Sequence, residues 1–308
     1  MDRKPPSITR RAFMLSAAAT ALGPRPFAAA ARAGIHTMPI PSTGERLPVV
    51  GMGTWLTFDV GADSWLRDER AKVLRAFFDL GGAVVDSSPM YGSSQEVLGY
   101  CLESIGGAAP LFAATKVWTP GRALGVRQMR YSRDLWGVER FDLMQIHNLV
   151  DWEVHLETLL DWKAAGKVRY IGVTTSHGRR HKDLTKIISN HPLDFIQCTY
   201  NILDREAETR LLPLAAERGM AVIINRPFRG GGLFGRFQDQ PLPDWAAEFN
   251  AANWAQFFLK FIISHPAVTC AIPATTRVDH MAENMGALYG RLPNATMRAR
   301  MADYVAGL

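Results

Sequence analysis

Residues 83–87 read AVVDS and residues 88–96 continue as SPMYGSSQE, a segment that contains an apolar run, a polar loop and a helix start. The apolar run at residues 83–85 has the length and composition of a buried strand. Residues 93–96 match a capping box, in which a serine at the helix start is followed three residues later by a glutamate. Before the run, apolar residues at helical spacing predict a helix over residues 71–80 that stops at Gly81. A strand between two helices is typical of the βα units of a parallel sheet.

Short apolar or β-branched runs of this kind recur along the chain. The eight expected strands are residues 49–53, 83–85, 111–115, 143–146, 170–173, 195–199, 221–224 and 269–272. Successive strands end about 30 residues apart, with room for one helix in each interval, and eight such units favour an α/β protein with a closed (β/α)8 TIM barrel. The last interval is longer because it contains residues 229–252, a Gly-, Pro- and Phe-rich loop of a length that is usually functional. Ahead of the barrel, residues 36–40 and 47–50 flank residues 42–45 and predict a β-hairpin that plugs the barrel bottom.

An open, doubly wound sheet is the alternative arrangement for alternating strands and helices. Its dinucleotide-binding form needs a third glycine shortly after a pattern such as GMG at residues 51–53, and Leu56 stands there instead. The glycines at residues 230–232 are not followed by the lysine of a P-loop. The closed barrel is therefore the preferred interpretation.

Residues 1–33 differ from the rest of the chain. Four basic side chains precede an Ala-rich apolar run at residues 12–23, which is the layout of an export signal. The run is shorter than the about 20 apolar residues that span a bilayer, so stable membrane insertion is not expected. Residues 9–14, TRRAFM, resemble the twin-arginine pattern that an export receptor reads. A disordered basic tail would explain the arginines but not the Ala-rich run, and we expect cleavage after Ala30 or Ala33.

The charge of the chain belongs mainly to this leader. Removal of residues 1–33 would lower the net charge from +6 to +1, so no electrostatic argument favours nucleic acid or an anionic membrane as a partner. Residues 34–308 contain no low-complexity linker and have the length of a single barrel domain. The three cysteines lie in apolar stretches and indicate no disulfide framework. This suits a protein that folds in a reducing cytoplasm and is then exported by the twin-arginine (Tat) machinery to a bacterial periplasm.

Four polar residues follow expected strands, at the end where the active site of such a barrel lies. They are Asp86, Tyr91 on the loop beyond it, Lys116 and His147. Each alone has an ordinary structural explanation, such as helix capping for an aspartate. All four on one face predict a catalytic site.

The chemistry of these side chains fits together. A tyrosine hydroxyl has a pKa of about 10, and a neighbouring ammonium group lowers it, so we expect Lys116 to lower the pKa of Tyr91. Asp86 would hold Lys116 charged and oriented. A neutral His147 and the Tyr91 hydroxyl would then donate hydrogen bonds to one oxygen and stabilise it as it gains charge.

The segments around these residues resemble the aldo-keto reductases, a family with an Asp, Tyr, Lys and His tetrad at successive strand ends of this barrel. The resemblance covers nearly all of residues 36–290, and its most specific segments are GMGTW at 51–55, Asp86 and Ser87 with SPMYGSS at 88–94, TK at 115–116, DLMQIH at 142–147 and GKVRYIGV at 166–173. It implies that Tyr91 is the proton donor and that the hydride comes from NAD(P)H. It also implies an enzyme that reduces a small aldehyde or ketone to an alcohol, or runs the reverse reaction.

The resemblance assigns binding residues one position at a time. Thr174 and Gln197 correspond to residues that hold the nicotinamide carboxamide. The other positions that resemble the cofactor site are Thr54, Asp86, Pro227, Pro273, Thr275, Thr276, Arg277, His280, Glu283 and Asn284. Trp55 and Trp118 correspond to aromatic walls of the substrate pocket, although a buried tryptophan often serves packing alone.

The chain departs from the family pattern at three places. Thr175 stands where an asparagine is usual, and residues 225–228, NRPF, replace a Tyr-Ser-Pro-Leu segment whose tyrosine stacks on the nicotinamide. Ala274 occupies a position often held by a lysine, which leaves Arg277 and His280 to meet the 2′-phosphate of NADP. NADP is the expected cofactor, with NAD as the alternative. The competing function is a non-catalytic, nucleotide-binding redox sensor or partner-binding subunit on the same barrel.

Residues 177–182, HGRRHK, place two histidines four residues apart, a spacing that presents both on one helix face and suits a metal. No Glu or Cys nearby completes a ligand set. We therefore expect a solvated helix start and no metal.

Overall fold

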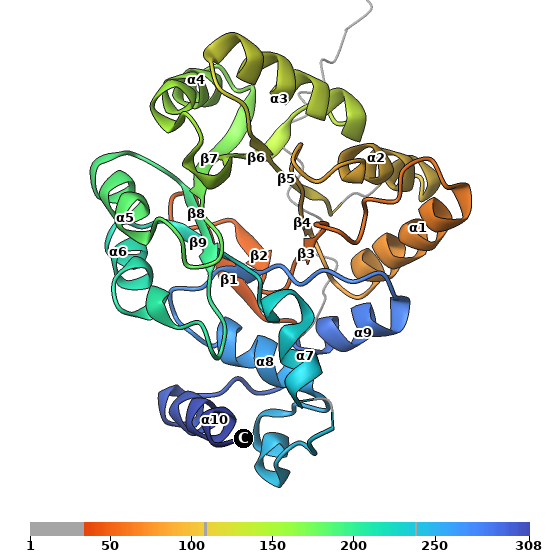
Figure 1. Ribbon diagram of the computed structural model, residues 1–308, viewed down its shortest axis with the longest axis vertical. Helices are drawn as coiled ribbons and strands as arrows, with labels where there is room; N and C mark the ends of the chain where they lie inside the picture. The colour runs from red at the N-terminus through yellow and green to blue at the C-terminus, as the bar shows by residue number, and fades with distance from the viewer. Residues whose placement is uncertain (1–33, 108–109, 238) are drawn as a thin grey trace, which may run out of the picture. The chain divides into compact units, whose positions relative to one another are not determined.

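The computed structural model describes residues 34–107, 110–237 and 239–308 of the protein. These residues form the (β/α)8 barrel expected from the sequence, preceded by a short antiparallel hairpin (Figure 1). The expected signal peptide, residues 1–33, lies outside the described residues.

Eight parallel strands make up the barrel. They are β3 (Met52–Gly53), β4 (Val84–Asp86), β5 (Phe112–Val117), β6 (Phe141–Ile146), β7 (Val168–Thr174), β8 (Phe195–Thr199), β9 (Ala221–Asn225) and β10 (Cys270–Ala271). Each strand pairs with the next, and a bridge between Val50 and Ala271 joins the last strand to the first, so the sheet closes on itself. The expected runs are all strands, and β6 and β7 begin earlier than expected because Phe141 pairs with Val168.

The helices lie outside the strands and cover the barrel (Figure 1). Those between or after the strands are α1 (Ser64–Asp79), α2 (Ser94–Ser104), α3 (Arg122–Trp136), α4 (Trp152–Ala164), α5 (His181–Asn190), α6 (Leu211–Glu217), α8 (Trp254–Ile263) and α9 (Val278–Gly286). The chain ends with α10 (Ala295–Gly307).

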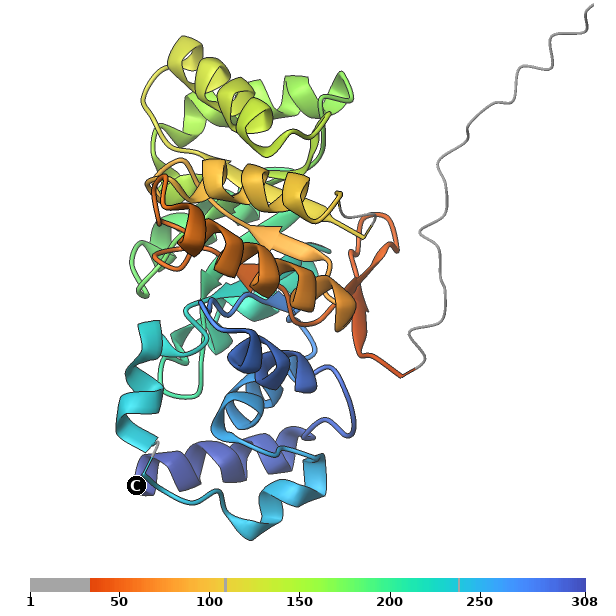
Figure 2. The same ribbon diagram turned by 90° about the vertical axis from the view of Figure 1, so that its right-hand side faces the viewer.

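The barrel interior and the hairpin form one apolar cluster. Its members are Ile40, Leu47, Val84, Phe112, Ala114, Leu143, Tyr170, Phe195, Ala221, Ile223, Cys270 and Ile272. Leu47 lies on β2 (Arg46–Pro48), which pairs with β1 (Thr37–Pro39), and this hairpin closes the end of the barrel where the strands begin (Figure 2). The predicted plug is therefore confirmed, and each large apolar side chain buried there contributes about 2 kcal/mol of hydrophobic stabilisation.

Two segments are more helical than the sequence suggested. The first helix, α1, begins at Ser64 rather than at residue 71, because the Asp63 side chain accepts a hydrogen bond from the backbone N–H of Leu66 and caps the helix there. Residues 229–252 contain the helix α7 (Gly232–Phe237) and a 3₁₀ segment, Asp244–Phe249. The interpretation of this segment as an irregular loop was wrong, since both short helices bury apolar side chains against the core.

The capping box predicted for α2 is absent. The helix begins at Ser94, but the Ser93 side chain makes no capping bond to it. The Ser93 hydroxyl instead donates to Asp59 and accepts from the backbone N–H of Gly61, each at 2.8 Å. The Ser93 hydroxyl therefore bonds to the loop before α1 instead of to the start of α2. No short sequence pattern reveals this choice.

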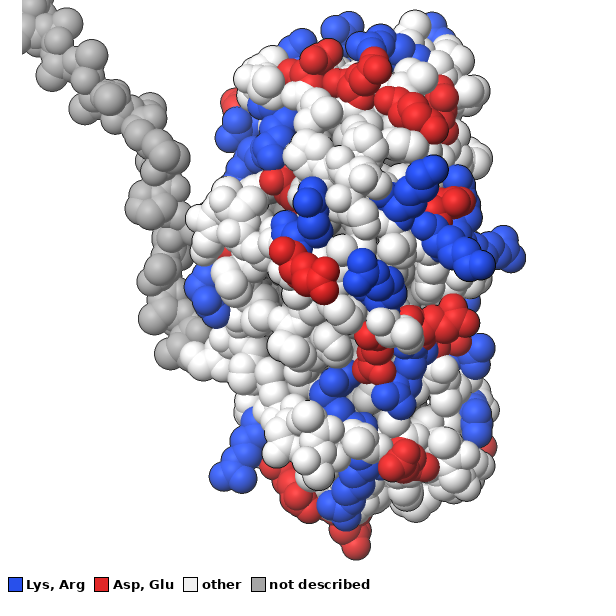
Figure 3. All heavy atoms as spheres, turned by 90° about the vertical axis from the view of Figure 1, so that its left-hand side faces the viewer, with Lys and Arg blue, Asp and Glu red and all other residues white. Residues whose placement is uncertain are grey.

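Acidic and basic side chains are interspersed on the face of the barrel that carries α5 and α6 (Figure 3). Neither sign of charge dominates that face. Over the part of the chain that the structure describes, no helix combines the length and the apolar character needed to cross a bilayer.

Candidate active site

Polar residues at the carboxyl ends of the strands share the faces that line the barrel interior. Asp86 lies two residues after Val84, and Lys116 lies two residues after Ala114. Because side chains alternate along a strand, both polar groups point into the barrel above its apolar layer. The corresponding positions of the neighbouring strands hold Gln145, Thr174 and Gln197. Strand periodicity thus places a polar layer at one end of the barrel.

Asp86 and Lys116 form a buried ion pair. The Lys116 Nζ donates to Asp86 Oδ2 at 2.5 Å and to the Ser87 carbonyl at 2.8 Å, and the lysine is completely shielded from solvent. Burial acts to lower the pKa of Lys116, but the Asp86 carboxylate and the Tyr91 hydroxyl outweigh it and raise that pKa. The ammonium group therefore stays charged at neutral pH.

The Asp86 carboxylate is also the centre of an amide network. Its Oδ1 accepts hydrogen bonds from Gln145 Nε2 at 2.9 Å and from Gln197 Nε2 at 3.0 Å. Asn225 continues the network, because its Nδ2 lies 3.4 Å from Gln197 Oε1 and its Oδ1 accepts from the Thr199 hydroxyl at 2.6 Å. Side chains from four strands thereby hold the carboxylate in one orientation.

Tyr91 is positioned by the loop between β4 and α2. Asp59 Oδ1 accepts hydrogen bonds from the backbone N–H and the hydroxyl of Ser93, both at 2.8 Å. Gly92, which lies between Tyr91 and Ser93, has a φ of +56°. A Cβ on this residue would lie 2.4 Å from the Asp59 carboxylate, so only glycine fits. The turn places the Tyr91 ring with its centroid 5.1 Å from Lys116 Nζ.

The pKa of Tyr91 differs from the sequence expectation. Burial raises the pKa of its hydroxyl, Lys116 acts to lower it, and Asp86 acts to raise it, with a net rise. Lys116 acts in the expected direction, but the predicted net lowering of the pKa was wrong because burial and the Asp86 carboxylate outweigh the ammonium. Tyr91 is therefore protonated at neutral pH, which is the form that a proton donor needs.

His147 lies beside Tyr91, with 5.7 Å between the ring centroids. Its Nδ1 lies 2.7 Å from the Ser88 hydroxyl, which also accepts a hydrogen bond from the backbone N–H of Met90 at 3.2 Å. For Nε2 to be the N–H donor to an oxygen in the cleft, the Ser88 hydroxyl must donate to Nδ1, and the 2.7 Å separation allows this. Burial, helped by the charge of Lys116, lowers the pKa of His147 to about 2. The imidazole is neutral, in agreement with the expectation.

Tyr91 and His147 line a cleft of about 660 Å³ at the carboxyl end of the barrel. The sequence-predicted residues that line it are Thr54, Trp55, Asp86, Tyr91, His147, Thr174, Gln197, Pro227, Pro273, Thr275, Thr276 and His280. Lys116 does not line the cleft itself, but it contacts Asp86 and Tyr91, which do. Residues far apart in the sequence thus meet in one site.

Some predicted site residues lie outside this lining. They are Trp118, Arg277, Glu283 and Asn284. Trp118 is partly exposed, and its ring centroid lies 6.5 Å from that of His147. Arg277 forms an ion pair with Asp279 on the surface. For Arg277 to meet a 2′-phosphate, its guanidinium must leave Asp279, whereas His280 already lines the cleft.

The cleft contains groups that fit a nicotinamide dinucleotide. The hydroxyl of Thr57 on its wall is buried and has no hydrogen-bond partner among the described residues. Arg70 of α1 donates to the carbonyls of Thr57 at 2.6 Å and Thr276 at 3.2 Å, so it holds the loops after β3 and β10 beside each other. Arg226 and Arg229 line the same cleft and supply positive charge for phosphate groups.

The two histidines of residues 177–182 do not share a helix. The helix α5 begins at His181, and His177 lies in the turn before it, so their predicted placement on one helix face was wrong. Within residues 34–107, 110–237 and 239–308, no three His, Cys, Asp or Glu side chains are grouped so that they could hold a metal ion.

Several residues of the site were not identified from the sequence, among them Gln145, Ser88 and Arg70 and the lining residues Thr57 and Arg229. Gln145 lies two residues before His147 on β6, so strand alternation was a usable signal for it. Neither Ser88 nor Arg70 carries a comparable signal. Their partners come from a different strand or from two distant loops, and only the tertiary structure brings them together.

Fold and site together define a class of protein, a (β/α)8 enzyme in which a tyrosine and a neutral histidine face a cleft above a buried lysine–aspartate pair. Within that class, the chain belongs to the aldo/keto reductase family, whose sequence model matches residues 49–300.

Curated relatives support this assignment. The chain is 28% identical to aldo-keto reductase YhdN of Bacillus subtilis over 219 residues, which cover 65% of this chain but only 64% of that relative. It is 25% identical to methylglyoxal reductase YeaE of Escherichia coli over 256 residues, which cover 82% of this chain and 89% of that relative.

Solved structures share the fold. An aldo/keto reductase from Klebsiella pneumoniae in complex with NADP and acetate matches with a TM-score of 0.72 and 24% identity, covering 85% of this chain and 93% of that one. The holo form of an aldo-keto reductase from Bacillus halodurans matches with a TM-score of 0.72 and 19% identity, covering 88% and 96%.

Proposed function

We propose that this member of the aldo/keto reductase family reduces a small aldehyde or ketone to an alcohol, or runs the reverse reaction, with NADP(H) as its redox cofactor. The observation that carries the proposal is the position of Tyr91 and His147. These two hydrogen-bond donors lie together in the main cleft, and a buried, charged Lys116 lies behind the tyrosine ring.

The reaction needs a proton delivered to an oxygen that is gaining negative charge. When bound, NADP(H) supplies the hydride to the carbonyl carbon or accepts it from the alcohol carbon. The Tyr91 hydroxyl donates its proton to the carbonyl oxygen, while His147 Nε2–H donates a second hydrogen bond and fixes the direction of that oxygen. Lys116 stabilises the phenolate that remains, because its ammonium lies 5.1 Å from the ring centroid and is shielded from water. In the reverse direction the phenolate takes the proton from the alcohol.

The matched test of this mechanism is Tyr91→Phe against Tyr131→Phe, since Tyr131 is an exposed tyrosine on α3. Methylglyoxal is a suitable probe because the relative YeaE is named for its reduction. Loss of the proton donor should lower kcat about 100-fold or more, while the affinity for NADPH, measured by fluorescence titration, stays within about twofold. Unchanged reduction in Tyr91→Phe would remove the basis of the proposal.

NADP is preferred over NAD because His280 lines the cleft and Arg277 lies on the same segment. No lysine is present at position 274 to take this role. Arg277→Gln and His280→Gln should therefore weaken NADP binding about tenfold each and leave NAD binding unchanged. Equal affinities of the unmodified protein for the two nucleotides would contradict the preference.

A non-catalytic nucleotide-binding subunit is the second candidate function. Asn225 favours it, because this residue stands where the family has a tyrosine that stacks on the nicotinamide, and its amide is bonded to Thr199 and to the Thr175 carbonyl. The Tyr91→Phe experiment separates the candidates. A protein that binds NADPH but reduces no carbonyl compound in its unmodified form fits the subunit.

We further propose that residues 1–33 are a twin-arginine signal peptide and that the barrel works in a bacterial periplasm. The paired arginines and the Ala-rich run support this. Changing Arg10 and Arg11 together to lysine should keep the protein in the cytoplasm with its leader attached. The same conservative exchange at Arg3 should leave export unchanged, and the new N-terminus is read by mass spectrometry. Export of the variant with both arginines changed would contradict the proposal that residues 1–33 are a twin-arginine signal peptide.

A periplasmic reductase has no pool of free NADPH to draw on. The cofactor must then be bound before export, retained, and regenerated by a second substrate. Protein purified from the periplasm should carry about one nucleotide per chain, identified by mass spectrometry after denaturation. Periplasmic protein that emerges without nucleotide would contradict cofactor retention but not the Tyr91 mechanism.

A further inference from the structure

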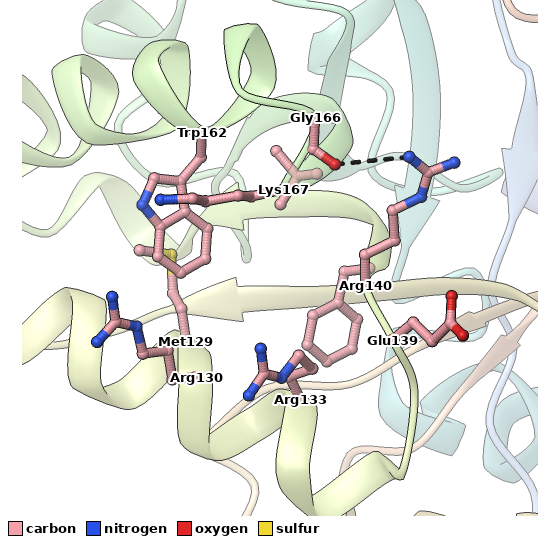
Figure 4. Close-up of a pocket in the computed structure, with 10 residues that line it drawn as sticks. Met129, Arg130, Arg133, Glu139, Arg140, Trp162, Gly166 and Lys167 are labelled. Atoms are coloured by element: carbon pink, nitrogen blue, oxygen red, sulfur yellow. Dashed lines mark hydrogen bonds between the residues drawn. The ribbon is translucent and has the colours of Figure 1, made fainter.

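A second cleft, of about 610 Å³, opens at the other end of the barrel strands (Figure 4). It lies between the C-terminal ends of α3 and α4, where β6 and β7 begin at Phe141 and Val168. The catalytic cleft lies at the opposite ends of the same two strands, at His147 and Thr174. The two clefts share no lining residue.

The charge of this second cleft is strongly positive. Its cations are Arg130, Arg133, Arg140 and Lys167, and its one carboxylate is that of Glu139. Of the four cations, only Arg133 has a carboxylate partner among the described residues, Asp134 on its own helix at 2.7 Å. Figure 4 shows Arg130 and Arg133 extending from α3 and Lys167 crossing the indole of Trp162.

The helix ends do not use these cations. Basic side chains often cap the free carbonyls at a helix C-terminus. In α3 the carbonyl of Arg133 accepts from the backbone N–H of Val138 at 3.4 Å. In α4 the carbonyls of Trp162 and Lys163 accept from backbone N–H groups at 2.8 and 3.0 Å. The backbone therefore caps both helices. Lys167 remains available to a ligand, and Arg133 can offer Nη1, the guanidinium nitrogen that does not bond to Asp134.

The floor of the cleft is apolar. Met129, Phe141 and Val168 are buried there, and the half-buried Trp162 ring lies 5.8 Å from Lys167 Nζ, measured at its centroid. Arg140 reaches across to the Gly166 carbonyl at 3.5 Å, which is too long for a strong bond. A ligand that fits must offer negative charge to the rim and a flat apolar group to the floor.

We propose that this cleft binds a small organic anion that carries a doubly charged phosphate beside an aromatic or similarly flat apolar group. The cations hold the phosphate by charge-assisted hydrogen bonds, in which arginine is favoured for its paired donors. Because Met129, Phe141 and Val168 are each no more than 2% exposed, the apolar contact comes mainly from the half-buried Trp162 ring. This site is independent of the carbonyl-reducing site.

The probe for this site is 1-naphthyl phosphate, titrated by calorimetry at an ionic strength of about 0.15 M, where the Debye length is about 8 Å. The variant Arg133→Gln with Lys167→Gln removes two rim charges and should weaken binding about tenfold or more. The control, Arg75→Gln with Lys186→Gln, makes the same charge change on exposed positions of α1 and α5 that do not line the cleft. It should change the affinity less than twofold, because distant surface charges are screened.

Two further arms test the position and chemistry of the site. Saturating NADP should leave the affinity for the probe unchanged, and competition by NADP would place the probe in the catalytic cleft and overturn the proposal. Inorganic phosphate and 2-naphthol should each bind at least about fivefold more weakly than 1-naphthyl phosphate, because each offers one half of the recognised chemistry. Equal weakening in the two double variants, or no binding of the probe at millimolar concentration, would also overturn it.

Discussion

Replacing Lys116 with methionine tests the buried pair on which the site depends. The methionine keeps an unbranched apolar stem but removes the ammonium that donates to Asp86 at 2.5 Å and to the Ser87 carbonyl at 2.8 Å. Asp86, which is 1% exposed, retains the amide donors Gln145 and Gln197 but loses the one cation that pairs with it among the described residues.

The loss should be large because an unpaired charge is left inside the barrel. Breaking a buried ion pair by removing one partner costs about 3 to 5 kcal/mol. The two amide donors to Asp86 favour the lower end of that range. For a domain of this size, 1 kcal/mol lowers Tm by roughly 2 to 4 °C, so Lys116→Met should unfold about 10 °C below the unmodified protein.

The assay is thermal unfolding of Lys116→Met, Asp86→Asn and the variant that combines them. Removing both charges leaves no uncompensated group, so the combined variant should be more stable than Lys116→Met by about 2 kcal/mol. If the effects of the two single changes simply add, the ion pair contributes no coupling energy and the reasoning is refuted.

Three further changes test other groups. As the pH falls from 6.5 to 5, His147 should lower the free energy of unfolding with a slope that rises from about 0.7 to about 1.3 kcal/mol per pH unit. The unfolded imidazole binds a proton in this range, whereas the folded one, with a pKa of about 2, does not. Urea unfolding of His147→Gln should show a flatter pH dependence, and an equal slope would contradict this. Ser88→Ala should lower kcat about tenfold or more with little change in KM, since Nδ1 loses its buried hydrogen-bond partner and the imidazole loses its fixed orientation. Ser88→Thr should recover most of kcat, and an unchanged kcat in Ser88→Ala rules out this positioning role. Lys260→Met should cost about 3 kcal/mol in urea unfolding, because three backbone carbonyls lose one buried ammonium, and a loss below about 1 kcal/mol would mean that water replaces it.

The strands and the catalytic residues were predictable because their signals are local. Each barrel strand is a short apolar run, and in a parallel barrel the carboxyl ends of all strands meet at one rim. Asp86 and His147 each follow such a run, so their meeting follows from the topology once the strands are recognised. The hairpin plug was predictable for the same reason, because its two apolar segments flank a turn.

The helix starts were less predictable because their caps depend on neighbours. Ser93 matches a capping pattern, yet its side chain bonds to Asp59 on another loop. Asp63 caps α1 in a segment with little apolar periodicity, which gave no reason to extend the helix that far. Alternative hydrogen-bond partners of a capping side chain differ little in free energy. Only the folded chain determines which of them lies within hydrogen-bonding distance.

By itself the sequence determined the eight-stranded barrel and the residue types at its catalytic rim, since both follow from periodicity and strand order. Only the tertiary structure decided that Tyr91 has a raised pKa, that Ser88 bonds to Nδ1 of His147, and that four cations surround a second cleft. These properties depend on burial and on distances between groups from separate strands and helices. Electrostatic and hydrogen-bond energies change steeply with both, and neither is encoded in any short segment of the chain.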